Sequence, residues 1–418
     1  MNQPDPVIVV GTTTDYIDWI RDARPGQTLF LTDTPLRQEA TEPAPGPGEE
    51  ILCDLTDADG VFALLVKHLA AGGRRPAGIA CFDCENMLLT ADLARRLDLP
   101  YPSASAVRNC RSKLASKQLW QPARVPCPRF QVARTAAEAQ AFAQSLAGPC
   151  VIKPISGAGS ELTFRCDSPV EARACFEQVK LALDDRKSLP MFNQVTAGPT
   201  AALMEEWIDG IEYSCDFVID KGAVTIVRMA RKYALKHGLF GITAGYELLP
   251  DSGPFNAGHL REHLARGAAA LGLERAFCMV DLIDQGGIPC FLEMAPRPGG
   301  DCLPWLLRRA AGVDVMGAYL DFCAGRPATP RPRVAPWLAV RLFADRGGVL
   351  RHIDTSELNA DPRVRDIYLK RHPGDKIELP PGDYDSWILG HVVYEPDPRL
   401  PVDHQNDKLA AMVRIKWD

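Results

Sequence analysis

The chain has 418 residues, of which 46% are hydrophobic and 24% charged, with a formal net charge of −6 at pH 7. This length fits two or three packed domains of an ordinary globular protein. The acidic balance argues against a general nucleic-acid binder, because such a protein needs excess lysine and arginine to neutralise phosphates. No run of about 18 apolar residues occurs, so no membrane span is expected.

The first 107 residues alternate strand-like and helix-like patterns, which predicts an open α/β sheet. Strands are expected at 6–11, 28–32 and 78–82, and helices at 61–71 and 86–97. No basic stretch precedes the first apolar run, so we expect no secretion signal. The G-x-G-x-x-G fingerprint of dinucleotide sites is absent. The sheet is therefore predicted to be structural, with room for a small-molecule site at its strand ends.

Thirteen cysteines are scattered singly, mostly inside apolar runs. An odd count without a framework predicts reduced, buried thiols and a cytoplasmic protein. Cys81 and Cys84 form one C-x-x-C pair, but a zinc site would need two further ligands at a suitable spacing, and none is evident. We predict that this pair packs in the core, with redox or metal binding as the alternative.

A lysine stands between an apolar run and a loop of small residues. Residues 150–152 predict a strand that delivers Lys153, and the loop contains Ser156, Gly157, Gly159 and Ser160. Glycines let successive backbone N–H groups turn toward an anion, and the lysine adds a positive charge beside them. The pattern predicts a loop for nucleotide phosphates, in an order different from the P-loop. A glycine turn beside a surface lysine is the alternative.

Residues 203–216 predict a strand, a short crossing segment and the first strand of a hairpin that turns at 220–222. A crossing segment leaves backbone N–H and C=O groups free, which is what an adenine edge needs as a partner. Glu212, seven residues after Glu205, could accept hydrogen bonds from ribose hydroxyls. Acidic residues that are merely solvated beside a hairpin are the alternative.

Two acidic residues stand inside apolar runs on either side of a predicted turn. A three-residue loop at 285–287 would pair Asp281 with Phe291 and place Asp281 and Glu293 on one face, whereas a two-residue loop would place them on opposite faces. On one face the acids would lie about 7–8 Å apart by backbone, which suits carboxylates that share magnesium. Buried acids without cations are costly or become protonated. A structural salt bridge to Arg297 is the alternative.

The glycine- and proline-rich stretch after residue 324 predicts a linker, because it cannot continue a helix or a sheet. Beyond it, strands are expected at 337–343, 349–353, 376–379 and 387–393, and a helix at 401–415. We therefore predict an α/β domain at 1–107, an α+β domain at 108–324, a linker at 325–336 and an α+β domain at 337–418.

The order of the lysine loop, a Glu-Glu-x-Ile-x-Gly-x-Glu segment and a hairpin ending in Glu-x-x-x-Arg resembles the ATP-grasp superfamily over residues 108–323. Lys113 and the segment 124–128 resemble that superfamily's first phosphate lysine and its strand entry. The resemblance implies an ATP-grasp fold with an N-terminal open α/β (pre-ATP-grasp) domain, an ATP-grasp domain of two α+β lobes around the ATP cleft, and a small C-terminal α+β domain. The C-terminal layout is more loosely similar to that of bacterial L-amino-acid (dipeptide) ligases.

The resemblance also implies a role for each site residue. Lys113 and Lys153 would contact the ATP phosphates under a lid at 156–160, and the nucleoside would be bordered by Glu205, Glu206, Ile208 and Glu212. Asp281 and Glu293 would hold Mg²⁺, or Mn²⁺ in its place. Arg297 would stabilise an acyl phosphate, and the same cleft would be reached by Arg231, Lys232 and His237. For His237 a plain loop residue is the alternative. Asp301 is expected to face the substrate and favour an amino group.

Ala295 departs from the pattern, because the superfamily usually has an asparagine there as a magnesium ligand. A second metal would then be weaker, or another carboxylate would replace the missing oxygen.

The implied activity is the ATP- and magnesium-dependent joining of a carboxylate to an amine through an acyl phosphate, with two amino acids, or an amino acid and another small acid or amine, as substrates. No nucleic acid or membrane partner is expected, and a homodimer is compatible with the resemblance. Two alternatives stay open: a carboxylase that activates bicarbonate, and a nucleotide-binding relative without turnover. Ala295 favours the second, whereas the presence of both lysines, both acids and Arg297 opposes it. No lysine stands between methionines as in a biotin carrier segment, which disfavours a fused carboxylase.

Overall fold

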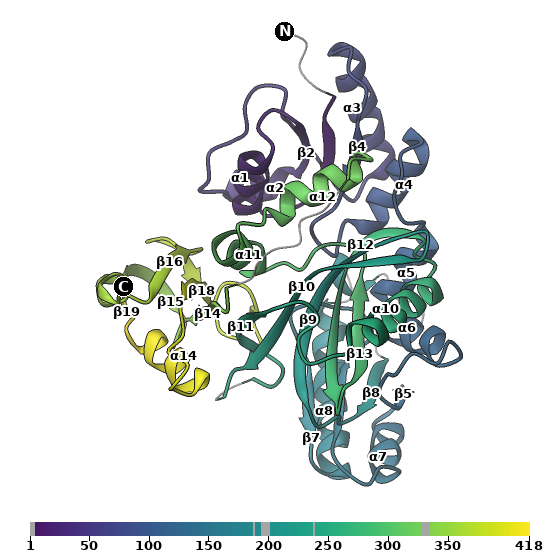
Figure 1. Ribbon diagram of the computed structural model, residues 1–418, viewed down its shortest axis with the longest axis vertical. Helices are drawn as coiled ribbons and strands as arrows, with labels where there is room; N and C mark the ends of the chain where they lie inside the picture. Colours follow the sequence, from purple (N-terminus) through teal and green to yellow (C-terminus); the bar gives the residue numbers. More distant parts are fainter. Residues whose placement is uncertain (1–4, 187–188, 194–200, 237–238, 328–334) are drawn as a thin grey trace.

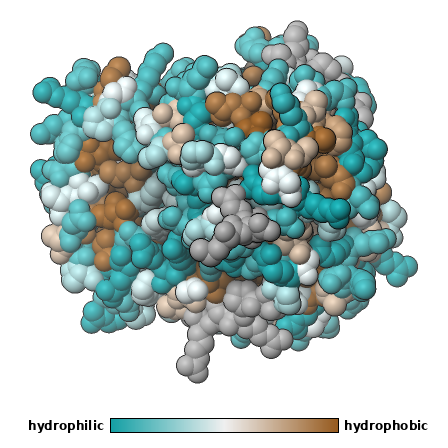
Figure 2. Space-filling view, turned by 90° about the horizontal axis from the view of Figure 1, so that it is seen from above, coloured by the Kyte–Doolittle hydropathy of each residue, from teal (hydrophilic) through white to brown (hydrophobic). Residues whose placement is uncertain are grey.

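The computed structural model describes residues 5–186, 189–193, 201–236, 239–327 and 335–418 (Figure 1). Within these ranges the strands form four sheets. None of the helices found there is both long and apolar enough to cross a membrane. The face drawn in Figure 2 is mostly hydrophilic, and its apolar patches are separated by hydrophilic residues.

The N-terminal part forms a parallel sheet in the strand order β3-β2-β1-β4. Its strands are β1 (Val7–Val10), β2 (Thr28–Asp33), β3 (Glu50–Cys53) and β4 (Gly78–Ala80), and its helices are α1 (Thr14–Ala23), α2 (Thr34–Glu39), α3 (Ala58–Ala71) and α4 (Met87–Leu97). This confirms the predicted open α/β sheet. The sequence patterns missed α1, α2 and β3; helix α2 buries none of its residues, so it carries no apolar periodicity.

A small lobe follows, at the lower end of Figure 1. Its sheet has the order β5-β8-β6-β7. The strands are β5 (Phe130–Ala133), β6 (Cys150–Pro154), β7 (Phe164–Cys166) and β8 (Ala202–Glu206), and the helices are α7 (Ala136–Gln144), α8 (Pro169–Arg186) and α9 (Pro190–Asn193). Two helices, α5 (Ala104–Arg111) and α6 (Lys113–Trp120), connect this lobe to the N-terminal sheet.

The largest sheet has eight strands in the order β13-β12-β9-β10-β11-β14-β18-β16. They are β9 (Ile211–Asp220), β10 (Ala223–Ala234), β11 (Thr243–Leu249), β12 (Arg275–Gln285), β13 (Ile288–Ala295), β14 (Leu338–Phe343), β16 (Val364–Leu369) and β18 (Ile388–Tyr394), and α10 (Ala257–Leu271) packs beside them. Strand β14 pairs with β11, so the strands after the predicted linker continue the sheet that precedes it. The linker itself lies mostly outside the described residues, and the division at 325–336 stays a prediction.

The C-terminal part also contains a three-stranded sheet in the order β17-β15-β19. Its elements are β15 (Gly348–Asp354), β17 (Lys376–Ile377), β19 (Arg414–Trp417), α13 (Ser356–Ala360) and α14 (Val402–Ala411). The helix predicted at 401–415 is therefore too long at its C-terminal end, because α14 ends at Ala411. The chain leaves the helix after Ala411 and pairs Arg414–Trp417 with β15, which a local pattern does not reveal.

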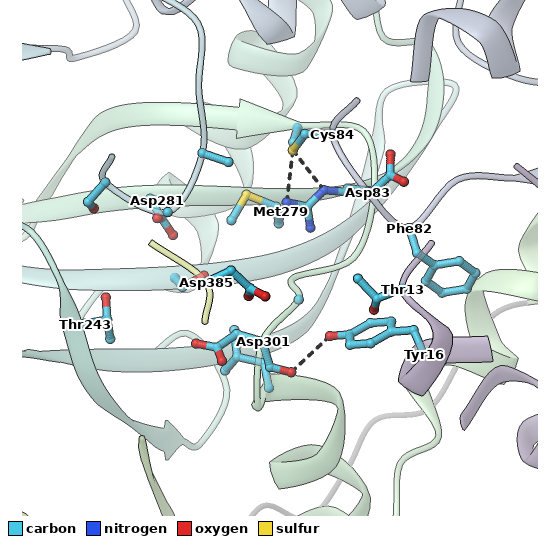
Figure 3. A pocket seen from close by; sticks show the side chains of 18 of the residues that line it. Thr13, Tyr16, Phe82, Asp83, Cys84, Thr243, Met279, Asp281, Asp301 and Asp385 are labelled. Carbon is cyan, nitrogen blue, oxygen red and sulfur yellow. Dashed lines mark hydrogen bonds between the residues drawn. The ribbon is translucent and has the colours of Figure 1, made fainter. Parts of the chain in front are cut away.

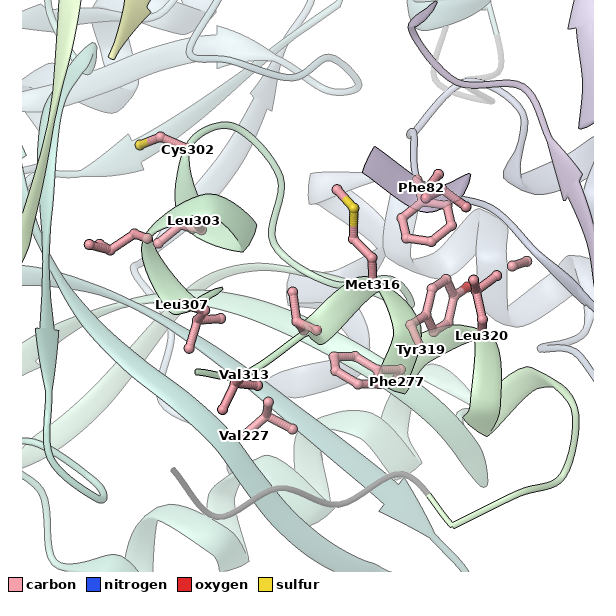
Figure 4. Packing of buried hydrophobic residues seen from close by; sticks show 14 of the residues in the cluster. Phe82, Val227, Phe277, Cys302, Leu303, Leu307, Val313, Met316, Tyr319 and Leu320 are labelled. Carbon is pink, nitrogen blue, oxygen red and sulfur yellow. The ribbon is translucent and has the colours of Figure 1, made fainter. Parts of the chain in front are cut away.

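Helices α11 (Leu303–Ala311) and α12 (Val315–Cys323) join the N-terminal sheet to the large sheet through one hydrophobic cluster (Figure 4). The ring of Tyr319 lies 5.1 Å from that of Phe82 and 5.5 Å from that of Phe277, measured between centroids. Phe82 follows β4 and Phe277 belongs to β12. This packing fixes the loop after β4 relative to the strands that carry the predicted acids.

Candidate active site

The two hairpin acids face each other because of a β-bulge. Gly286 and Gly287 make a two-residue turn with φ values of +64° and +92°, a conformation that glycine adopts at no steric cost. Of the two loop lengths that the sequence left open, the structure therefore has the shorter. The register is regular until Leu282 pairs with Phe291, and then one extra residue lets Asp281 pair with Glu293. A two-residue turn by itself would place the two acids on opposite faces of the hairpin. The extra residue shifts the register by one position, so both acids lie on the same face.

A fully buried lysine, Lys117, contacts the bulge. Its Nζ donates a hydrogen bond of 2.8 Å to the carbonyl oxygen of Leu292, the extra residue, and lies 2.8 Å from Glu205 Oε1. The other oxygen, Glu205 Oε2, lies 2.8 Å from Lys153 Nζ. Burial alone would raise the pKa of Glu205, but the two lysines outweigh it and lower that pKa. Glu205 thus links the predicted phosphate lysine to the acid hairpin.

Sequence reasoning missed Lys117, although a signal was present. It stands four residues after Lys113 in helix α6, and this spacing places both lysines on one helix face. Burial lowers the pKa of Lys117, and Glu205 opposes that shift.

Lys113 connects the glycine loop to the acid pair. Its Nζ donates a hydrogen bond of 3.0 Å to Gly157 O and lies 3.5 Å from Glu293 Oε2. Burial alone would raise the pKa of Glu293, but Lys113, Lys153 and Lys232 lower it to about 2. Glu293 is therefore ionised at neutral pH and available to a cation.

Lys232 lies between two predicted site acids. Its Nζ is 2.9 Å from Asp281 Oδ2 and also contacts Glu212 Oε1. Burial would lower the pKa of Lys232, but Asp281 and Glu212 raise it well above its ordinary value. Burial raises the pKa of Glu212 in spite of the lysine. The neighbouring Arg231 stacks its guanidinium 4.7 Å from the ring centroid of Tyr233.

Two cavities meet at the acid pair, one of about 480 Å³ and one of about 530 Å³. Both are lined by the loop residues 157–160 and by Lys113, Lys232, Asp281 and Glu293. The second is called here the nucleotide cavity, after the ligand predicted for its residues, and it alone of the two is lined by Lys153, Ser156, Glu205, Glu206, Ile208, Glu212 and Arg231. The first is called here the substrate cavity, after the role predicted for Arg297, which lines only this one. His237 lies outside the described residues. The structure brings the other predicted residues together, and their individual roles stay predictions.

Arg297 lines the substrate cavity and stands two residues after the end of β13. Its Nε and Nη2 lie 3.3 and 3.1 Å from Cys84 Sγ, and its Nη1 donates to Pro298 O at 2.7 Å. These contacts differ from the salt bridge to the hairpin acids considered as an alternative. Of the C-x-x-C pair, Cys81 is buried in the core, whereas Cys84 is half-buried, packs against the same cluster and also lines the cavity. All thirteen cysteines are free thiols.

The acid pair suits a divalent cation. Asp281 Oδ1 is buried and has no hydrogen-bond partner among the described residues, while Oδ2 is held by Lys232. Glu293 stands directly opposite on β13, and Ala295 adds no side-chain oxygen. The described part of the chain contains no group of three or more metal-ligating side chains. Magnesium prefers six oxygens, so phosphate and water oxygens would have to complete its coordination.

The rest of the substrate cavity comes from the N-terminal part and from the C-terminal strands. In Figure 3, Asp301 lies between Asp281 on one side and Tyr16 on the other. Tyr16 Oη donates to Asp301 O at 3.0 Å, and Arg341 Nε lies 3.1 Å from Asp301 Oδ2. Asp301 lines the cavity, but its carboxylate pairs with Arg341. The sequence did not predict a role for Arg341, because this residue is far from Asp301 in the chain and no local pattern indicates that the two pair.

Comparisons with known proteins agree with this geometry. A family model described as an ATP-grasp domain matches residues 146–304. An uncharacterized protein of Sinorhizobium fredii is 28% identical over 93% of this chain and 77% of its own length. A D-alanine–D-alanine ligase of Ralstonia nicotianae is 28% identical over 57% of this chain and 69% of its own length. The crystal structure of an L-amino acid ligase from Bacillus licheniformis superposes with a TM-score of 0.75 at 17% identity, covering 100% of both chains, which shows a shared fold.

Proposed function

Because this chain belongs to the ATP-grasp superfamily, we propose that it is an ATP- and magnesium-dependent ligase that joins the carboxylate of one amino acid to an amine. The observation that carries the proposal is the position of Asp281 and Glu293 at the junction of the two cavities. A nucleotide on one side would then present its terminal phosphate to an acid on the other. The amino-acid substrates are supported by similarity to a D-alanine–D-alanine ligase, which is a relative and not this protein.

In the proposed reaction, ATP lies in the nucleotide cavity with its phosphates toward Lys153, Lys113 and the loop 157–160. These groups would position the phosphates, because a lysine and the N–H groups of a glycine loop both bind anions. A divalent cation held by Asp281 and Glu293 would supply neutralisation of charge on the phosphates. Lys117 would keep Glu205 in place between the two lysines and so maintain the position of Lys153.

The substrate carboxylate needs activation, because oxide is a poor leaving group. Attack of a carboxylate oxygen on the γ-phosphorus forms a mixed anhydride and releases ADP. The amine then attacks the acyl carbon and loses a proton, and the tetrahedral oxyanion expels phosphate to give an amide. Arg297 would stabilise the charge on the acyl phosphate and the oxyanion, and such a donor is typically worth about 3–4 kcal/mol in the transition state.

The two alternatives predict other outcomes. A bicarbonate-activating carboxylase would release phosphate from ATP only when bicarbonate is present. A relative without turnover would bind ATP and release no phosphate, and Ala295 is the residue that keeps this alternative open. The thirteen free thiols support the proposed cytoplasmic location.

Phosphate release from ATP and magnesium, measured across all pairs of the common L-amino acids, tests the proposal. We expect release with particular pairs, a new amide by mass spectrometry, and loss of both in Arg297→Ala. Release that depends on bicarbonate instead would support the carboxylase. ATP binding without any release would support the relative without turnover, and Ala295→Asn would then show whether the missing ligand is the cause.

A further inference from the structure

His391 stands in a row of three side chains on the C-terminal strands. On β18 it is paired with Arg341 of β14 on one side and with Tyr368 of β16 on the other. Directly opposed residues of neighbouring antiparallel strands project from the same face of the sheet. All three line the substrate cavity, and none lines the nucleotide cavity. The row therefore belongs to the substrate side of the site.

The imidazole of His391 is held firmly in place. Its exposed fraction is 5%, and its ring centroid lies 5.2 Å from that of Tyr368 and 6.3 Å from that of Trp305. Burial lowers the pKa of His391 to about 4, although Asp301 and Asp366 act against this shift. The ring is therefore neutral at neutral pH, and each nitrogen can either donate or accept one hydrogen bond.

His391 Nε2 is buried and has no hydrogen-bond partner among the described residues. The charged groups around the ring have partners of their own. Arg341 pairs with Asp301, Asp15 accepts from Tyr368 Oη at 3.2 Å, and Asp366 accepts from Trp305 Nε1 at 2.8 Å. Buried polar atoms in proteins are usually paired, so an unpaired nitrogen on a residue that lines a cavity points to a partner from outside the described chain, which is a ligand group or a water.

We propose that His391 is a specificity-determining residue whose Nε2 binds a hydrogen-bonding side group of an amino-acid substrate. The substrate class is an amino acid with a side-chain hydroxyl, carboxamide or ring nitrogen, in preference to an aliphatic one of the same shape. This proposal rests on the ligase function proposed above. A site with a hydrogen-bonding group discriminates strongly against a ligand that leaves this group unpaired, whereas an apolar wall does not.

The test compares amino acids matched in shape: threonine with valine, asparagine with leucine, and glutamine with methionine. The ratio of kcat/KM for the polar over the aliphatic member is measured by phosphate release, with a fixed second substrate. We expect the wild type to favour the polar member of at least one pair. His391→Phe keeps an aromatic ring in place and should reduce this preference about 10- to 100-fold, mainly through the KM of the amino acid. The KM for ATP should stay unchanged.

Two further variants separate the role of Nε2 from a structural role of the ring. His391→Gln can place an amide near the position of Nε2 and should keep most of the preference, whereas His391→Asn ends near Nδ1 and should lose it. His404→Gln, on the exposed side of α14, is the matched control and should behave as the wild type. If His391→Phe does not fold, the comparison of the His391→Gln variant with the His391→Asn variant decides.

Either of two results would overturn the inference while leaving the ligase intact: a wild type that favours the aliphatic members, or a preference unchanged in His391→Phe and His391→Asn. The second result would mean that Nε2 holds only water. A wild type that releases no phosphate with any amino acid overturns the ligase proposal itself, and the inference with it.

Discussion

Lys117 Nζ donates a hydrogen bond of 2.8 Å to the main-chain oxygen of Leu292, the extra residue that brings Asp281 opposite Glu293. The two residues are 175 positions apart in the chain. A helix that precedes the small lobe therefore contacts the backbone of the acid hairpin at its irregular point. The same lysine pairs with Glu205, so one side chain connects the acid pair to the strand that lines the nucleotide cavity.

Lys117→Met should destabilise the protein by about 3–5 kcal/mol, because it leaves Glu205 buried with one cation fewer. Urea unfolding gives the free-energy difference. The double variant Lys117→Met, Glu205→Gln should recover part of the loss, since it removes the uncompensated charge. A single variant as stable as the wild type would show that the buried pair contributes nothing to folding.

Arg297→Ala should lower kcat by about 10²- to 10³-fold if the guanidinium stabilises the oxyanion. The KM for ATP should change little, because Arg297 lines the substrate cavity and not the nucleotide cavity. Cys84→Ser is the matched control: a serine oxygen can accept the same hydrogen bonds from Arg297, so its kcat should stay within a few-fold of the wild type. A large loss in the serine variant alone would assign the chemistry to the thiol instead.

Ala295→Asn should lower the magnesium concentration needed for half-maximal phosphate release. Ala295 lines the substrate cavity two residues after Glu293, and an asparagine would add an oxygen ligand that a water otherwise replaces. Titration with Mg²⁺ and with Mn²⁺ at saturating ATP measures the effect. Asp281→Asn should raise the magnesium concentration needed, and an unchanged magnesium requirement in both variants would contradict the proposed cation site.

The buried His391 should make the protein less stable in mild acid. Its pKa is about 4 in the fold against an ordinary value of 6.5, so below pH 6.5 the unfolded chain takes up a proton that the folded chain does not. Stability should therefore fall as the pH drops from about 6.5 to about 4, by up to roughly 3 kcal/mol. His391→Gln removes this group, so the unfolding free energy of the variant should fall less over this pH range. An equal fall in both proteins would show that the ring has an ordinary pKa in the fold.

Local patterns predicted the order of the elements that carry the proposed nucleotide site. A few neighbouring residues were enough to predict the apolar strand before Lys153 and the glycine loop after it. The same holds for the apolar strands that contain Asp281 and Glu293. The order of these segments also supported the superfamily assignment. Local reasoning failed at the turn of the hairpin, where residue spacing could not show the bulge at Leu292.

The sequence by itself determined which chemical groups are present and that they stand in the order of an ATP-grasp protein. Only the tertiary structure decided that Lys117 contacts the bulge, that Arg297 contacts Cys84, and that the C-terminal strands place His391 in the substrate cavity. The physical reason is that strand pairing and helix packing bring together residues far apart in the chain, and no local periodicity records which distant partners meet.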